Sequence, residues 1–161
     1  MDQQKIDEWI EKGDRLAKEN NWEQAVYNYA LAANCNDCCA LKKLADCYAK
    51  GKGVAIDKEQ AFLNYLKSAE MDPFYAAYEL GKCYEEGIGT EINKKQAFEW
   101  YQKAMKGCIG DIKAKRKVCE FYNSGIGVRK DPRKARVLQM ELQTHDKRMD
   151  DLDIMFRDMG I

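Results

Sequence analysis

The chain of 161 residues carries 27 basic and 27 acidic side chains, and this zero net charge argues against general nucleic-acid binding. Hydrophobic residues make up 45% and charged residues 34% of the sequence, a balance that suits a helical protein with one buried core. The apolar runs are too short to span a membrane, and the N-terminal residues lack the apolar stretch of a secretory signal. We therefore expect one cytoplasmic domain that binds neither nucleic acid nor membrane.

The charge is unevenly distributed along the chain. Residues 1–40 hold 4 basic and 8 acidic side chains, and residues 137–161 hold 3 and 6, whereas residues 111–136 hold 9 and 3. Charge runs of this kind usually form a solvated surface. The alternative is that residues 111–136 form a basic patch that meets an acidic partner.

The first predicted elements in chain order are the two helices of a hairpin within residues 6–34. Trp9, Gly13 and Leu16 share one face of the first helix, and the chain breaks at residues 19–21. Small residues where the two helices meet predict a close approach between them.

Three copies of a ten-residue pattern follow this hairpin. The pattern reads LADCYAKGKG from Leu44 to Gly53 and LGKCYEEGIG from Leu80 to Gly89, and a worn copy, VCEFYNSGIG, begins at Val118. The copies begin 36 and 38 residues apart (80 − 44 and 118 − 80). Self-similarity at this period predicts a stacked-repeat architecture.

Each copy is predicted to form the first helix of a further helical pair, over residues 39–50, 75–86 and about 112–123. Two glycines end each of these helices, because glycine adopts positive φ at little cost. Asp57, Asn93 and Asp131 then stand where the capping residue of a second helix is expected.

The pattern changes after Leu142. Apolar residues recur every three to four positions there, at Met149, Leu152, Phe156 and Met159. This spacing predicts a separate amphipathic helix over residues 147–159. The helix either covers the open edge of the last repeat or docks on a partner.

The residues quoted above carry a resemblance to a known family. LGKCYEEGIGTEINKKQAFEWYQKA, from Leu80 to Ala104, resembles a Sel-one-like repeat (SLR), and residues 44–69 are similar to it, with Ala45 in place of a glycine. Residues 118–140 resemble only its first half, since Leu138-Gln139 replaces the aromatic pair. Residues 12–33 look instead like a tetratricopeptide (TPR) repeat, the superfamily to which SLR proteins belong.

The resemblance implies an all-α fold, a right-handed α–α superhelix (solenoid) of about four helix hairpins with a C-terminal capping helix. We divide residues 1–161 into a TPR-like unit (6–38), two SLR units (39–74 and 75–110), a degenerate SLR unit (111–144) and the capping helix (145–161). In such families the first helices line a concave groove that holds a protein or peptide segment, and no catalytic motif is shared.

The groove-facing residues follow from the register of the three first helices. We predict a protein-binding groove formed by Lys42, Asp46, Lys50, Tyr75, Tyr78, Lys82, Glu86, Lys113, Arg116 and Glu120. Tyrosine and arginine are frequent anchors of protein interfaces. The leading hypothesis is a non-catalytic adaptor or scaffold, a monomer or weak homodimer, that binds a protein or peptide segment without a cofactor or a metal.

Two alternatives remain at this point. The same fold would suit an immunity-type protein or inhibitor that neutralises a cognate toxin or enzyme by tight binding. An enzyme or metal protein would have to use Cys35, Cys38, Cys39 and Cys47, which offer one C-x-x-C pair and no nearby histidine. The total of seven cysteines is odd, and without a signal sequence we expect them to be reduced.

Overall fold

The computed structural model describes residues 2–106 and 112–158, with the exception of the side chains of Phe74 and residues 150–158. The regular elements in these ranges are eight α-helices and no strands. They are α1 (Gln3–Lys18), α2 (Trp22–Ala33), α3 (Cys38–Lys50), α4 (Lys58–Met71), α5 (Pro73–Glu86), α6 (Lys94–Met105), α7 (Ile112–Ser124) and α8 (Pro132–Asp158).

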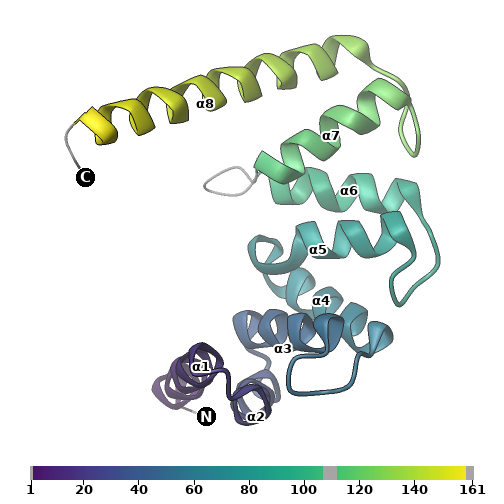
Figure 1. Ribbon diagram of the computed structural model, residues 1–161. Helices are drawn as coiled ribbons and strands as arrows, with labels where there is room; N and C mark the ends of the chain where they lie inside the picture. Colours follow the sequence, from purple (N-terminus) through teal and green to yellow (C-terminus); the bar gives the residue numbers. More distant parts are fainter. Residues whose placement is uncertain (1, 107–111, 159–161) are drawn as a thin grey trace.

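The helices form four consecutive hairpins that stack one on the next (Figure 1). Within each hairpin the two helices pack side by side, and the second helix then packs against the first helix of the following hairpin. This contact pattern between sequence neighbours defines an α–α solenoid. The prediction of an all-α repeat fold is confirmed.

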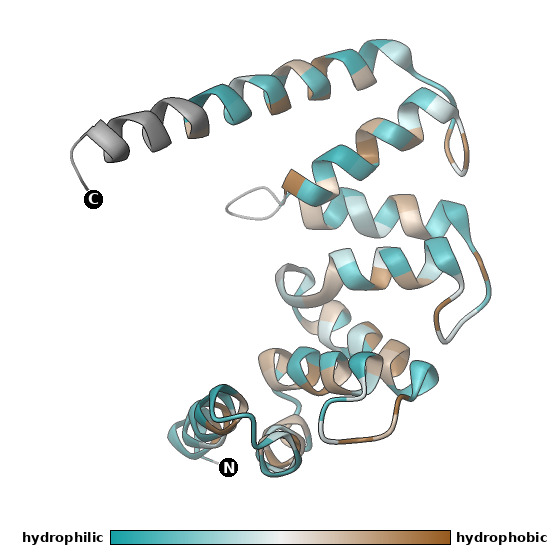
Figure 2. Ribbon diagram, in the orientation of Figure 1, coloured by the Kyte–Doolittle hydropathy of each residue, from teal (hydrophilic) through white to brown (hydrophobic). Residues whose placement is uncertain are grey.

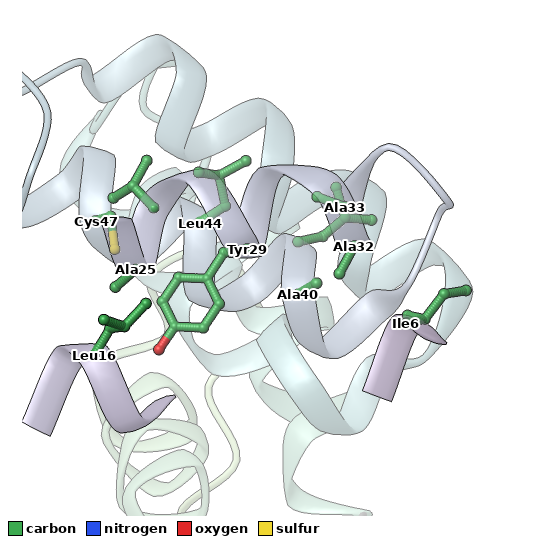
Figure 3. Close-up of a cluster of buried hydrophobic side chains, with 11 residues drawn as sticks. Ile6, Leu16, Ala25, Tyr29, Ala32, Ala33, Ala40, Leu44 and Cys47 are labelled. Carbon is green, nitrogen blue, oxygen red and sulfur yellow. The ribbon is translucent and has the colours of Figure 1, made fainter. Parts of the chain in front are cut away.

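Small residues at one repeat position allow the helices to approach closely. Ala25, Ala61, Ala97 and Ala135 occupy this position in the second helix of each hairpin, and all four are fully buried. Four residues after each of the first three alanines stands a tyrosine. Figure 3 shows the first of them, Tyr29, in the middle of the cluster formed by the first two hairpins.

The predicted capping residues stabilise the N-termini of the second helices. The side chains of Asp57, Asn93 and Asp131 each accept a hydrogen bond from the backbone N–H three residues later, at 2.9, 3.1 and 3.1 Å. These bonds satisfy amide groups that have no partner within the helix. Asp37 caps α3 in the same way, with its carboxylate 2.8 Å from the amide nitrogen of Ala40.

The two glycines of each loop have different roles. Gly51, the first glycine after α3, ends the helix at φ +66°. The second glycines, Gly53, Gly89 and Gly127, also have positive φ, and each lies against the backbone at the start of the second helix of the preceding hairpin. A Cβ atom at Gly89 would collide with the carbonyl group of Lys58. The second glycine is therefore a contact between units.

The end of the chain differs from the prediction. Instead of a break followed by a separate helix over 147–159, α8 runs for 27 residues without interruption. Residues 142–147 contain neither glycine nor proline, so nothing ends the helix there. Arg116 of α7 also holds Asp146 of α8 through two hydrogen bonds of 2.9 and 3.1 Å. The capping contacts expected of Leu152, Phe156 and Met159 lie outside the described side chains.

Candidate functional site

The predicted groove residues lie on α3, α5 and α7, the first helices of three hairpins. The structure brings five of them together around one hollow of about 600 Å³, here called the central groove: Asp46, Lys50, Tyr78, Lys82 and Glu86. The hollow lies among α3, α4, α5 and the loop that follows α5, so the second hairpin and the third both line it.

The central groove has apolar walls and a charged rim. Ala49, Cys83 and Ile88 contribute apolar surface. The ring of Tyr78 is held by Tyr101, whose centroid lies 5.4 Å away. Lys50, Lys58 and Lys82 line the groove with exposed side chains, and Lys82 is 3.9 Å from Glu86. Such a surface suits an elongated ligand with both apolar and charged groups.

Lys58, Glu79 and Ile88 line the groove but were missing from the predicted set. Lys58 opens α4, a second helix, and Ile88 lies in a loop, whereas the prediction considered one face of the first helices. The only sequence signal for Lys58 was its place directly after the capping residue Asp57.

Two residues that the sequence predicts as ligand contacts have partners inside the protein. The carboxylate of Asp46 accepts a hydrogen bond of 2.6 Å from the hydroxyl of Tyr65 and one of 2.7 Å from Lys42. Lys42 also lies 3.9 Å from Glu79 on the next first helix. Asp46 and Lys42 thus join α3 to α4 and α5, and the carboxylate of Asp46 also lines the central groove.

A tyrosine–carboxylate–lysine arrangement recurs along the solenoid. Tyr29 donates a hydrogen bond to Asp14 (2.8 Å), and Lys43 of the next hairpin binds the same carboxylate at 2.7 Å. Burial and the carboxylate raise the pKa of Tyr29 well above its usual range. This triad connects α1, α2 and α3 through the partly buried carboxylate of Asp14, whereas Asp46 joins only α3 and α4, because its lysine partner Lys42 is also on α3.

The triad of the third hairpin has the same connectivity. Tyr101 donates to Glu85 (2.7 Å), and Lys117 of α7 lies 3.1 Å from that carboxylate. Burial and the hydrogen bond to Glu85 again raise the pKa of the tyrosine. The sequence signal for these triads is the spacing of 36 residues between Tyr29, Tyr65 and Tyr101, none of which belongs to the predicted face of the first helices.

The first triad predicts a pH dependence of stability. Burial alone would raise the pKa of Asp14, but the hydrogen bonds from Lys43 and Tyr29 outweigh it and lower this pKa. A lowered folded-state pKa stabilises the protein above the unfolded pKa, about 3.9, and this stabilisation is lost as pH falls through the folded-state value. The loss of unfolding free energy caused by Asp14→Asn should therefore be largest near pH 7 and shrink toward pH 3, as measured by urea unfolding.

Lys43→Met provides the control for this experiment, because it removes the charge that stabilises the Asp14 carboxylate. In the Lys43→Met background the effect of Asp14→Asn should depend less on pH. An effect of Asp14→Asn that stays constant from pH 7 to pH 3 would contradict the assignment.

Arg116 and Glu120 line a different hollow, of about 370 Å³, between α7 and α8. The guanidinium of Arg116 is 2.9 Å from the carboxylate of Asp146, so its ion pair fixes α8 beside α7. Tyr75 is 42% exposed on α5, and Lys113 is exposed on α7; neither lines this hollow or the central groove. Of the ten predicted residues, five thus line the central groove and two line the hollow between α7 and α8.

The cysteines near the start of α3 are thiols. Cys35 donates a hydrogen bond to the carbonyl of Leu31 at 3.5 Å, and burial raises the pKa values of Cys38, Cys39 and Cys47. Among the residues that the structure describes, no group of three or more His, Cys, Asp or Glu side chains could hold a metal ion. His145 lies 3.9 Å from Asp146 on the surface of α8.

None of the helices in the described ranges has the length and apolar character needed to span a membrane.

Comparison with known proteins places the chain among repeat proteins. It is 26% identical to a Sel1 repeat protein from Oxalobacter formigenes, with a TM-score of 0.75, over 84% of this chain and 55% of that one. It is also 26% identical to c5321, a protective antigen of uropathogenic Escherichia coli strains with an SLR fold, with a TM-score of 0.81, over 87% and 30% of the two chains. The chain thus spans about half of the first relative and a third of the second. A comparison with curated proteins finds no match.

The Sel1 repeat model matches four stretches, residues 9–37, 40–73, 74–106 and 112–138. The first of these is the unit that looked like a TPR repeat in the sequence, so the Sel1 pattern extends to all four hairpins. Sel1 repeats generally form non-catalytic modules for protein–protein interaction. The chain belongs to the Sel1 repeat family.

Proposed function

We propose that this chain is an adaptor that holds an elongated segment of another protein in the central groove. One observation carries the proposal: a hollow of about 600 Å³ lies between two hairpins and combines apolar walls with exposed lysines. Grooves of this size with a few polar groups at the rim are typical binding sites. The adaptor would act by shape and charge, without chemistry of its own.

The charges of the groove define which side chains can bind a ligand. Asp46 already has two internal partners, and Lys42 lies close to both Asp46 and Glu79. Lys50 and Lys58, in contrast, extend exposed side chains at the rim. A ligand that approaches the ring of Tyr78 therefore meets three exposed lysines, Lys50, Lys58 and Lys82, and one exposed carboxylate, that of Glu86. This excess of positive charge supports binding of a segment with acidic and aromatic residues.

The groove can be tested by charge reversal. Peptides are selected from a display library on the immobilised protein, and their affinities are measured by fluorescence anisotropy. We expect the double variant Lys58→Glu, Lys82→Glu to bind the selected peptides with an affinity at least about tenfold lower, because two attractive charges become repulsive. The matched control is Lys67→Glu with Lys95→Glu, which makes the same change in charge at exposed positions outside the groove.

Equal affinities for the two double variants would contradict the proposed groove. The proposed groove would also be refuted if the peptides bound both double variants equally and their binding to the wild type simply weakened when the salt concentration was raised to 0.5 M. That result would show a non-specific charge attraction.

We further propose that this adaptor works in the cytoplasm as a monomer or weak homodimer. The support for this compartment is the cysteine content: the sequence has an odd number of cysteines, seven, and Cys38, Cys39, Cys47, Cys83 and Cys119 are thiols. Thiols persist in reducing compartments.

A further inference from the structure

A second hollow, here called the C-terminal hollow, lies at the opposite end of the solenoid from α1. It measures about 340 Å³ and is formed by α6, α7 and α8. Its lining residues are Gln102, Met105, Tyr122, Arg133, Lys134, Val137 and Leu138. None of them belongs to the central groove, so the two surfaces can be changed independently.

The sequence of the last hairpin creates this hollow. Leu138 occupies the position that Trp100 occupies in the third hairpin, three residues after the buried alanine. The side chain of Trp100 is only 7% exposed and fills the space between neighbouring helices. A leucine at this position is smaller, and a hollow bounded by Tyr122 and Met105 lies beside it.

The surface around the hollow is apolar although it faces solvent. Val137 is 56% exposed and Met140, one turn further along α8, is 60% exposed. Figure 2 shows hydrophobic and hydrophilic residues alternating along this part of α8. The outer residues of α1 at the other end are polar, as expected for a capping helix, among them the exposed Gln4, Glu8 and Glu11. Exposed apolar groups beside a hollow mark an interaction surface.

A basic strip borders the apolar surface. Residues 129–136 carry five basic side chains and one acidic one, Asp131, and all five basic side chains are exposed. Asp131 caps α8 and is 3.6 Å from Lys134, which also lies 5.3 Å from the centroid of Tyr122. The strip therefore keeps a net positive charge directly beside the hollow.

We propose that the C-terminal hollow docks an acidic protein segment. A bulky apolar side chain of this segment enters between Tyr122 and Leu138, and its carboxylates face Arg133 and Lys134. Charge complementarity selects the acidic partner, and the apolar lining selects the side chain that anchors it. The concave shape favours a protruding side chain over the flat surface of a membrane. The chain thus carries a second binding surface in addition to the central groove.

The test uses a fluorescein-labelled peptide with the core Glu-Asp-Trp-Leu-Glu-Asp and two matched peptides. One replaces Trp by Ser, and the other replaces the four acidic residues by their amides. Fluorescence anisotropy with the full chain should show binding of the first peptide and at least about tenfold weaker binding of each matched peptide. Its affinity should also fall steeply between 0.05 and 0.3 M salt, because the contacts at the rim are ionic.

Variants then locate the binding site. Leu138→Trp fills the hollow, and Val137→Glu places a carboxylate on its exposed edge. Each substitution should lower the affinity for the peptide at least about tenfold. Arg133→Glu with Lys134→Glu should do the same. Lys67→Glu with Lys95→Glu, which changes two exposed lysines outside both hollows, should leave this binding unchanged. Any part of the binding that is lost in Lys58→Glu with Lys82→Glu belongs to the central groove. Circular dichroism melting curves establish that each variant is folded, and Val137→Glu is a surface change that the fold should tolerate.

Three results would overturn the proposal. The first is equal binding of the peptides with and without Trp. The second is unchanged affinity in Val137→Glu and Leu138→Trp. The third is a preference for another occupant: binding of phosphatidylserine vesicles but not the peptide, or a concentration-dependent dimer in sedimentation experiments that Val137→Glu converts to monomer.

Discussion

Gly89→Ala is expected to lower the free energy of unfolding by about 3 kcal/mol, since it combines two costs. Gly89 has φ +68°, a conformation that costs any residue with a Cβ about 1–2 kcal/mol. The new methyl group would also collide with the carbonyl of Lys58 in the preceding hairpin. A backbone cannot rotate away as a side chain can, so the contact between the second and third hairpins must open. Urea unfolding followed by circular dichroism measures the loss.

Gly87→Ala is the matched control. Gly87 has nearly the same φ, +72°, but a Cβ there would meet Cγ1 of Ile92 at 2.9 Å. The side chain of Ile92 is 64% exposed and has room to move. We expect a loss of about 1–2 kcal/mol, the conformational cost alone. Equal losses for the two variants would show that the second glycine serves only to end the loop.

Tyr101→Ala should have the largest effect of a single side-chain truncation, a loss of about 4 kcal/mol. Tyr101 is fully buried. Its ring packs against Tyr78 of α5 and Phe121 of α7, with centroid distances of 5.4 and 6.0 Å. Removal of the ring leaves a cavity at the junction of three helices and deprives Glu85 of a hydrogen bond.

Tyr101→Phe separates the loss of unfolding free energy caused by the missing hydroxyl from the loss caused by the missing ring. The ring remains, but the hydroxyl that donates to Glu85 at 2.7 Å is gone. We expect a loss of about 1–2 kcal/mol, because Lys117 still partners the carboxylate at 3.1 Å. Urea unfolding of both variants under the same conditions provides the comparison. If Tyr101→Phe were as destabilising as Tyr101→Ala, the hydrogen bond and not the packing would dominate at this position.

The repeat architecture could be predicted because its signals are local and recur. The spacing of the glycine pairs, the capping residues Asp57, Asn93 and Asp131, and the alanines at one helix position all act within a few residues of their place in the chain. Each of these features favours the same backbone conformation in three or four units. Agreement between independent local signals is what makes a fold predictable from sequence.

The candidate site was less predictable because it depends on distances between units. Helical register predicted Lys50, Tyr78 and Lys82 as groove residues, and all three line the central groove, but it could not show that Asp46 is bound by Tyr65 and Lys42. A long polar side chain can reach several neighbours, and its partner follows from how the helices pack. For the same reason the prediction did not include Lys58, which lies on the second helix of its hairpin and lines the groove.

The sequence alone determined the helical repeats, their period and the ends of most helices, since backbone preferences and apolar spacing act locally. The tertiary structure decided which charges are paired inside the solenoid, that the second glycine of each loop contacts the preceding unit, and that α8 continues beyond residue 144. It also revealed the C-terminal hollow beside Leu138. These features depend on the approach of helices from different hairpins, and that approach is fixed only when the whole array packs together.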